Sequence, residues 1–166
     1  MVSNLCKMDK ELVQILDVGC GPGYVGQYLK QDGYANIDGM DKNQQMLNMA
    51  SENKAYDELL NITFGDPDSV PNAFKDTYDF VIASSLVCKN HEPGMCKEAD
   101  RTIFENLLYC TKVGGYVIFA AKQDHRGEDQ YKEIISILQE QYHWKFVSEH
   151  QYSRFYNACD KFGRTK

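Results

Sequence analysis

A short apolar run that ends in a cluster of glycines is the feature that most restricts the fold of this chain. Residues 13–18 read Val-Gln-Ile-Leu-Asp-Val, and residues 19–23 follow as Gly-Cys-Gly-Pro-Gly. The apolar run is typical of a buried parallel strand. The glycines predict a tight turn in which bare backbone can approach a ligand, beside the N-terminus of a helix over residues 24–31.

Predicted strands and helices alternate along the rest of the chain. Apolar patterning predicts further strands at residues 36–40, 62–64, 78–83, 116–121 and 144–156. Helices are predicted from Gln44, at residues 56–60, around residues 103–108 and at residues 131–142. This order implies an α/β fold with right-handed crossovers: a doubly wound, mainly parallel sheet with helices on both faces. We expect residues 1–166 to form a single domain.

Charge and composition exclude several classes of function. The net charge is −6, with 24 acidic and 18 basic residues, which disfavours long nucleic acid as a partner. We see no apolar run long enough for a signal peptide or a membrane span, and the six cysteines include no Cys-x-x-Cys pair. We therefore expect a cytoplasmic protein with reduced thiols and no membrane partner.

One group of soft ligands falls close together in the sequence. Cys88, His91 and Cys96 lie within nine residues and are all residue types that bind zinc. A fourth ligand at a suitable spacing is missing, so we predict no metal site.

The glycine turn is preceded by an acidic residue, Asp17, at the end of the first predicted strand. In a doubly wound sheet this edge of the strands binds the ligand. A carboxylate there suits an ammonium group and a sulfonium cation better than a pyrophosphate. We therefore expect a ligand that is cationic at this end.

Residues 15–23, Ile-Leu-Asp-Val-Gly-Cys-Gly-Pro-Gly, match the first motif of the class I S-adenosylmethionine-dependent methyltransferases, which this chain resembles. The resemblance covers the order of elements from about Val13 to about Trp144. More narrowly, Ile-Asp-Gly-Met-Asp at residues 37–41, followed by Met46, resembles the Williams-Beuren region methyltransferase-like subgroup. The resemblance implies a Rossmann-like methyltransferase fold and S-adenosyl-L-methionine as the cofactor.

The resemblance also assigns roles to single residues. It implies that four residues of the first motif bind the methionine moiety of the cofactor: Asp17, Gly19, Gly21 and Gly23. Asp41 is assigned to the two ribose hydroxyls, Asp66 to the adenine amine, and Ser84 to the methyl-transfer side. Met46 either packs on the adenine or belongs to the ordinary core. Pro67 departs from the family pattern, because it has no N–H to offer the adenine ring.

Methyl transfer is an in-line displacement, so alignment of the acceptor supplies much of the rate. His91 is the candidate general base for a protonated nucleophile, and a surface histidine is the alternative reading. The residues after Ala83 form neither Asn-Pro-Pro-Tyr nor Asp-Pro-Pro-Tyr, the motifs of amino-group methylation of nucleic-acid bases. We therefore expect a small-molecule acceptor.

Two other functions remain open at this point. Gly21-x-Gly23-x-x-Gly26, with Asp41 further on, fits the dinucleotide fingerprint of an NAD-dependent oxidoreductase, although no Tyr-x-x-x-Lys pair follows. The chain also fits a non-catalytic cofactor-binding module that acts through a protein partner.

The second alternative rests on the short ends of the chain. Asp17 lies so near the first residue that little room is left for the helices that usually form an N-terminal cap, and only nine residues follow Asn157. We expect the final antiparallel strand to be missing or incomplete. The exposed sheet edge near residues 144–156 would then favour self-association.

Overall fold

The computed structural model describes Val2 and residues 8–66, 68–84 and 96–120, with the side chains of the last range from residue 101 onward. It further describes residues 135–137, 139–143, 145 and 147. The chain divides into two compact units, residues 1–134 and residues 135–166. In the second unit, residues 135–137 and 139–142 are helical, within the predicted helix at residues 131–142.

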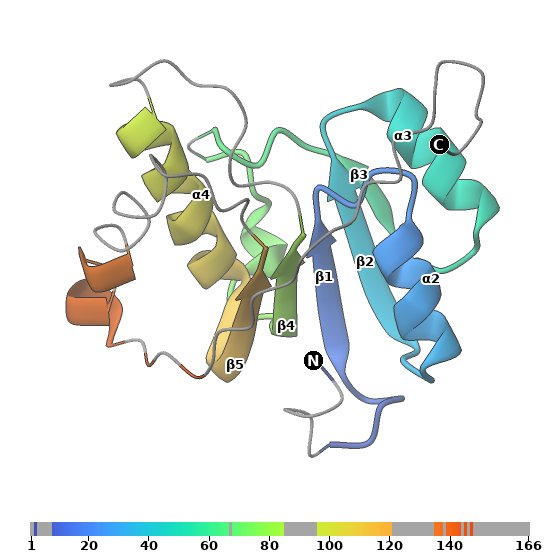
Figure 1. Ribbon diagram of the computed structural model, residues 1–166, viewed down its shortest axis with the longest axis horizontal. Coiled ribbons are helices and arrows are strands. Elements are labelled where there is room, and N and C mark those ends of the chain that lie inside the picture. The colour runs from blue at the N-terminus through green and yellow to red at the C-terminus, as the bar shows by residue number, and fades with distance from the viewer. Residues whose placement is uncertain are drawn as a thin grey trace, which may run out of the picture. The chain divides into compact units, whose positions relative to one another are not determined.

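The first unit contains a sheet of five described strands in the order β3-β2-β1-β4-β5, and every pairing is parallel (Figure 1). The strands are β1 Gln14–Val18, β2 Asn36–Asp41, β3 Leu59–Asn61, β4 Tyr78–Ala83 and β5 Thr111–Phe119. Chain order reverses at β1, with β2 on one side and β4 on the other. This is the predicted doubly wound α/β architecture, and that prediction is confirmed.

Among the described residues of the first unit, three α-helices cover the sheet: α2 Tyr24–Gln31, α3 Gln44–Glu52 and α4 Cys96–Cys110. A short 3₁₀ helix, η1, spans Asn72–Phe74. Ile118 of β5 packs with the cluster that includes Leu29 of α2, whereas the ring of Phe119 meets that of Phe104 of α4 at 5.2 Å. Because neighbouring residues of a strand point to opposite faces, α2 and α4 lie on opposite faces of the sheet.

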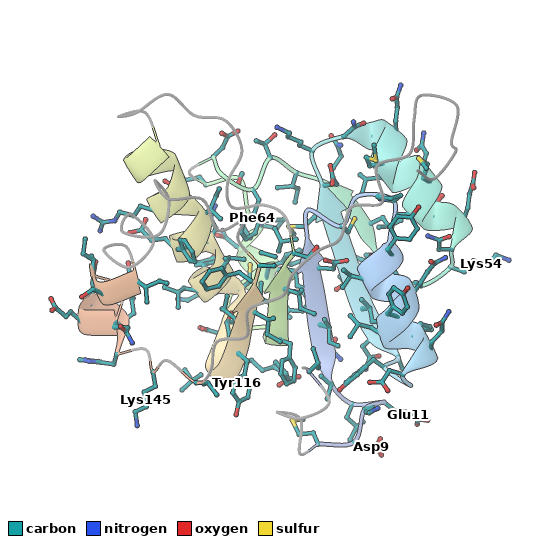
Figure 2. The ribbon with its side chains drawn as sticks, viewed as in Figure 1. Asp9, Glu11, Lys54, Phe64, Tyr116 and Lys145 are labelled. Atoms are coloured by element: carbon teal, nitrogen blue, oxygen red, sulfur yellow. The ribbon has the colours of Figure 1, made fainter. Side chains whose placement is uncertain are left out.

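The core on the α2 side combines alternate residues of the strands with residues of α2 and of the segments beside the strands. Tyr116 of β5, labelled in Figure 2, packs against it. The cluster consists of Val2, Val13, Ile15, Leu29, Tyr34, Ile37, Phe80 and Ile82. The intervening residues of the strands point to the other face, and among them Leu16 and Val81 are fully buried.

No helix in the described part of the chain is long and apolar enough to cross a membrane.

The region between α3 and β4 differs from the prediction. The predicted helix at residues 56–60 and strand at residues 62–64 are both wrong, because β3 occupies Leu59–Asn61 and Tyr56 lies in an irregular connection. Pairing of β3 with β2 decides the strand's position: Leu59 is opposite Gly39, where its side chain fills the space that a Cβ would need. The apolar pattern of residues 56–64 contains no information about that partner.

Strand β5 begins earlier than predicted, at Thr111, and contains an irregularity. Its partner register moves from Tyr78 opposite Thr111 to Phe80 opposite Tyr116. Gly114 has a positive φ of 83°, and Val113 is 99% exposed, so this part of the strand protrudes from the ladder.

The predicted last strand at residues 144–156, and with it the proposed self-association edge, lies mostly outside the described residues.

Candidate cofactor site

The glycine loop follows β1 at the edge where the parallel strands end (Figure 1). Gly19, Gly21 and Gly23 have positive φ angles of 68°, 54° and 89°. Only glycine adopts these conformations without strain, which explains its repetition here. The N–H groups of Gly19 and Cys20 donate to the carbonyl oxygen of Met40 at 2.8 and 3.0 Å, so the loop is fixed to the end of β2.

Asp41, the last residue of β2, holds the same loop through its side chain. Its Oδ2 accepts a hydrogen bond from the Gly21 N–H at 2.9 Å, and its Oδ1 accepts from the Asn43 N–H at 2.8 Å. The carboxylate is half-buried. Since each carboxylate oxygen has a second lone pair, Asp41 can still accept hydrogen bonds from a ligand diol.

The glycines of the loop differ in how much free space lies beside them. A Cβ placed on Gly21 would meet no heavy atom of the described residues within 4 Å. A Cβ on Gly23 would lie 3.0 to 3.2 Å from Asn53, Tyr56 and Ala50. Gly21 therefore faces open space, whereas Gly23 allows the chain to pack closely against α3 and the connection after it.

Asp17 is fully buried on the α2 side of β1. Its Oδ2 accepts a hydrogen bond of 2.7 Å from the Tyr56 hydroxyl, and its Oδ1 has no hydrogen-bond partner in the part of the chain that the structure describes. Burial raises the pKa of this carboxyl from 3.8 to about 6; the Tyr56 hydrogen bond opposes the rise, and the charge of Asp41 adds to it. At neutral pH the group is mainly ionised and available to a cationic donor.

Cys20 lies between the two carboxylates in sequence and is buried. Burial, together with the charges of Asp17 and Asp41, raises the pKa of its thiol to about 12. The thiolate is the reactive form of cysteine, so Cys20 is an inert part of the loop rather than a nucleophile.

A second loop approaches the same edge after β3. Asp66 is exposed, and its backbone is fixed by Asn106 of α4, whose Nδ2 donates to the carbonyl oxygens of Phe64 at 2.6 Å and Asp66 at 3.3 Å. Phe64, labelled in Figure 2, is buried. The α4 helix therefore sets the position of the loop to which the adenine was assigned.

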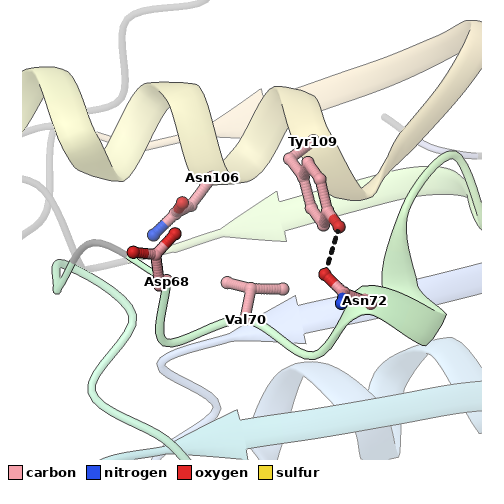
Figure 3. Close-up of a pocket in the computed structure, with 5 residues that line it drawn as sticks. All are labelled: Asp68, Val70, Asn72, Asn106 and Tyr109. Atoms are coloured by element: carbon pink, nitrogen blue, oxygen red, sulfur yellow. Dashed lines mark hydrogen bonds between the residues drawn. The ribbon is translucent and has the colours of Figure 1, made fainter.

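A pocket of about 180 Å³ lies between the segment after this loop and α4 (Figure 3). It is lined by Asp68, Val70, Asn72, Asn106 and Tyr109, and the Tyr109 hydroxyl donates to Asn72 Oδ1 at 3.1 Å. Pockets for cofactor-sized ligands are larger, at about 300 to 1,000 Å³. This pocket is therefore too small to hold a whole nucleoside cofactor.

The structure brings together part of the predicted site. Asp41 is hydrogen-bonded to the glycine loop at the ends of β1 and β2, and Asp17 is linked through the Tyr56 hydroxyl to Gly26 in the first turn of α2. Met46 lies half-buried in the first turn of α3, and Ser84 lies half-buried directly after β4.

The remaining acceptor-side and metal candidates lie outside the described side chains. His91 and Cys88 lie outside the described residues, and the side chain of Cys96 does too. Within the described ranges, no group of three or more His, Cys, Asp or Glu side chains is arranged to hold a metal ion.

The sequence of the sheet and its glycine loop matches a known family. Residues 15–115 match the family described as a methyltransferase domain, which is more than half of the chain. This chain belongs to the methyltransferase domain family. The match begins within β1, includes the glycine loop, Asp41 and Asp66, and ends within β5.

Curated relatives of this methyltransferase domain act on different substrates. The chain is 32% identical over 112 residues to malonyl-[acyl-carrier protein] O-methyltransferase of Pectobacterium atrosepticum, covering 68% of this chain and 40% of that protein. It is 29% identical over 109 residues to the 18S rRNA (guanine-N(7))-methyltransferase RID2 of Arabidopsis thaliana, covering 63% and 36%. The chain thus spans about two-fifths of the length of the relatives it matches.

The fold is also that of solved methyltransferases. A SAM-dependent methyltransferase of Leishmania major superposes with a TM-score of 0.61 at 16% identity, covering 81% of this chain and 57% of the other. At this identity the likeness shows the fold of the methyltransferase domain.

The sequence did not point to two residues that support the site, Tyr56 and Asn53. The Tyr56 hydroxyl contacts both Asp17 and the Gly26 N–H. The Asn53 Nδ2 donates to the Pro22 carbonyl oxygen at 2.7 Å. Both residues lie in the connection after α3, far from any motif. One signal was present: Gly26 lies inside a helix and Gly39 inside a strand, positions where glycine often marks a close approach of another group. In this methyltransferase domain that group is the Tyr56 ring at Gly26, and the Leu59 side chain together with the Tyr56 ring at Gly39.

Proposed function

We propose that this chain binds S-adenosyl-L-methionine and transfers its methyl group to a small-molecule acceptor. The observation that carries the proposal is the space left open beside Gly21 by the described residues. The loop is held by Asp41 and adjoins a buried carboxylate, one oxygen of which has no partner among those residues. Bare backbone, a diol acceptor and an acceptor for an ammonium group are the features that this cofactor requires. Membership of the methyltransferase domain family supports the same assignment.

Each residue has a role in this proposal. Asp17 accepts from the ammonium group of the methionine moiety, and Asp41 accepts from the ribose hydroxyls. Asp66 accepts from the adenine amine, Met46 packs on the adenine, and Ser84 borders the methyl-transfer side. The cofactor supplies a methyl group already activated by the sulfonium. The protein's contribution is therefore to bind and align, with His91 as the base for an acceptor that must lose a proton.

A small molecule is favoured as the acceptor because the net charge of −6 opposes binding of a polyanion. The malonyl-[acyl-carrier protein] methyltransferase is an example of a relative with an ester acceptor, and RID2 is one with an rRNA acceptor. Labelled S-adenosylmethionine, incubated with a metabolite extract and separately with total RNA, separates these possibilities. Label in RNA alone would contradict the proposed acceptor class.

The geometry disfavours a nicotinamide dinucleotide. Asp17 would bring negative charge towards a pyrophosphate at the same loop. The third glycine of the fingerprint, Gly26, lies against the Tyr56 ring and does not face the open side of the loop. Calorimetric titration with S-adenosylhomocysteine and with NAD tests the assignment: we expect binding of the first and none of the second. The reverse result would overturn the proposal.

An Asp41→Ala variant is expected to bind S-adenosylhomocysteine about ten- to a hundredfold more weakly than the wild type. Loss of charge-assisted hydrogen bonds to the ribose costs roughly 1.5 to 3 kcal/mol. The same change frees the Gly21 and Asn43 N–H groups, so the loop also loses its support. Calorimetry gives the dissociation constant, and circular dichroism checks the fold. A dissociation constant equal to that of the wild type would remove Asp41 from the site.

A further inference from the structure

Tyr56 makes two hydrogen bonds with its hydroxyl, one on each side of the glycine loop. The hydroxyl donates to Asp17 Oδ2 at 2.7 Å and accepts from the Gly26 N–H at 3.1 Å. A phenol has a single proton to donate, so Asp17 is the acceptor that receives it. The two bonds join the end of β1 to the first turn of α2 through a residue of the α3–β3 connection.

The bond to Gly26 substitutes for a missing helix cap. The N-cap residue of α2 is Gly23, which has no side chain and makes no side-chain capping bond. The first N–H groups of a helix need acceptors from outside the helix, and the Tyr56 hydroxyl serves the Gly26 N–H. Tyr56 thus fixes the direction in which α2 leaves the glycine loop.

The ring of Tyr56 is enclosed by glycines. A Cβ on Gly26 would lie 2.6 Å from its hydroxyl oxygen and 2.8 Å from Cε1, and a Cβ on Gly39 would lie 2.9 Å from Cδ1. No larger residue fits at either glycine while Tyr56 keeps this position. The chain therefore places one specific side chain beside Asp17.

We propose that Tyr56 is a positioning residue of the cofactor site: its hydroxyl orients the Asp17 carboxylate and keeps it ready to accept the ammonium group of the cofactor's methionine moiety. This inference rests on the proposed function. In this role Tyr56 acts on the cofactor through Asp17 and α2.

The proposal predicts a specific pH dependence. The groups that face Asp17 are Tyr56, Asp41 and Cys20; the first stabilises its ionised form and the charge of the second opposes it, while the Cys20 thiol is neutral. Without the hydroxyl, Asp17 is protonated more readily, so binding that needs the ionised carboxylate is lost at a higher pH. A purely structural role would lower affinity equally at every pH.

The test is the affinity for S-adenosylhomocysteine of the wild type and Tyr56→Phe between pH 5 and 8. In the variant we expect the midpoint of the pH profile to rise by about one unit, which weakens binding at pH 6 about fivefold. Tyr78→Phe is the matched control, since it removes a similar bond of 2.9 Å to Asp38, three residues before the end of β2. Its profile should equal that of the wild type.

The outcomes separate this inference from the proposed function. Superimposable profiles of wild type and Tyr56→Phe would overturn the positioning role alone. Absence of binding by the wild type at every pH would overturn both. If Tyr56→Phe does not fold, Gly26→Ala is the second variant, because its Cβ would displace the Tyr56 hydroxyl. An unshifted profile in that variant would contradict the role equally.

Discussion

A Gly21→Val variant is expected to lose S-adenosylhomocysteine binding by more than about a hundredfold, because charge-assisted contacts of several ligand groups are lost together. The valine side chain would project into the open space beside the loop, where no atom in the described part of the chain lies within 4 Å of the Cβ. It would occupy the position proposed for the methionine moiety. Calorimetric titration measures the loss.

Gly114→Val is the matched control for this substitution. Gly114 also has a positive φ, and a Cβ there also meets nothing within 4 Å among the residues that the structure describes, but it lies in the irregular part of β5. A branched residue in this conformation costs on the order of 1 to 2 kcal/mol at either position. Both variants should therefore lose similar stability, and only Gly21→Val should lose binding. Equal binding by the two variants would place the cofactor elsewhere.

An Asp17→Asn variant is expected to be more stable than the wild type at pH 7 and to bind the cofactor at least about tenfold more weakly, since a charged hydrogen bond is lost. The asparagine keeps an oxygen that accepts from the Tyr56 hydroxyl, as Asp17 Oδ2 does. It removes the negative charge that is otherwise buried at this position. Gain of stability and loss of binding thus have the same cause.

The sign of the stability change follows from the pKa of Asp17, which is raised from 3.8 to about 6 in the folded protein. Between these values the folded state holds a proton that the unfolded state releases, so the stability contributed by this group falls as pH rises and is lowest above pH 6. The difference between variant and wild type should grow from near zero below pH 4 to roughly 3 kcal/mol above pH 6.

Denaturant unfolding at pH 4 and at pH 7 measures this difference. Asp38→Asn is the control, because Asp38 also accepts from a tyrosine, Tyr78, and burial also raises the pKa of its carboxyl. That variant should keep full cofactor affinity. A wild type that is as stable as Asp17→Asn at pH 7 would show that the buried carboxylate is not destabilising.

Local patterns were sufficient for much of this fold. The helix at residues 24–31 and the strand at residues 78–83 have the predicted bounds, and β1 and β2 differ from theirs by one residue. Each of these elements carries its own signal: a continuous apolar run for a strand buried on both faces, or a helical stripe that ends at a glycine. The alternation of such elements was enough to predict the parallel, doubly wound sheet. The first motif also pointed to the glycine loop and to Asp17.

Hydrogen bonds between segments that are distant in the sequence determined the parts of the fold and site that local patterns did not predict. Strand β3 is short, and its place depends on hydrogen bonds to β2, so the apolar residues around it predicted the wrong helix and strand. Tyr56 reaches Asp17, 39 residues away, and Gly26, 30 residues away, because the crossovers bring the α3–β3 connection back over β1. A local sequence pattern shows that Asp17 ends a strand. Only the tertiary structure buries the Asp17 carboxylate and leaves one of its oxygens unpartnered among the described residues. The tertiary structure also supplies Tyr56, which donates to the second oxygen. Burial and hydrogen bonding depend on side chains from separate elements, so a local pattern does not contain them.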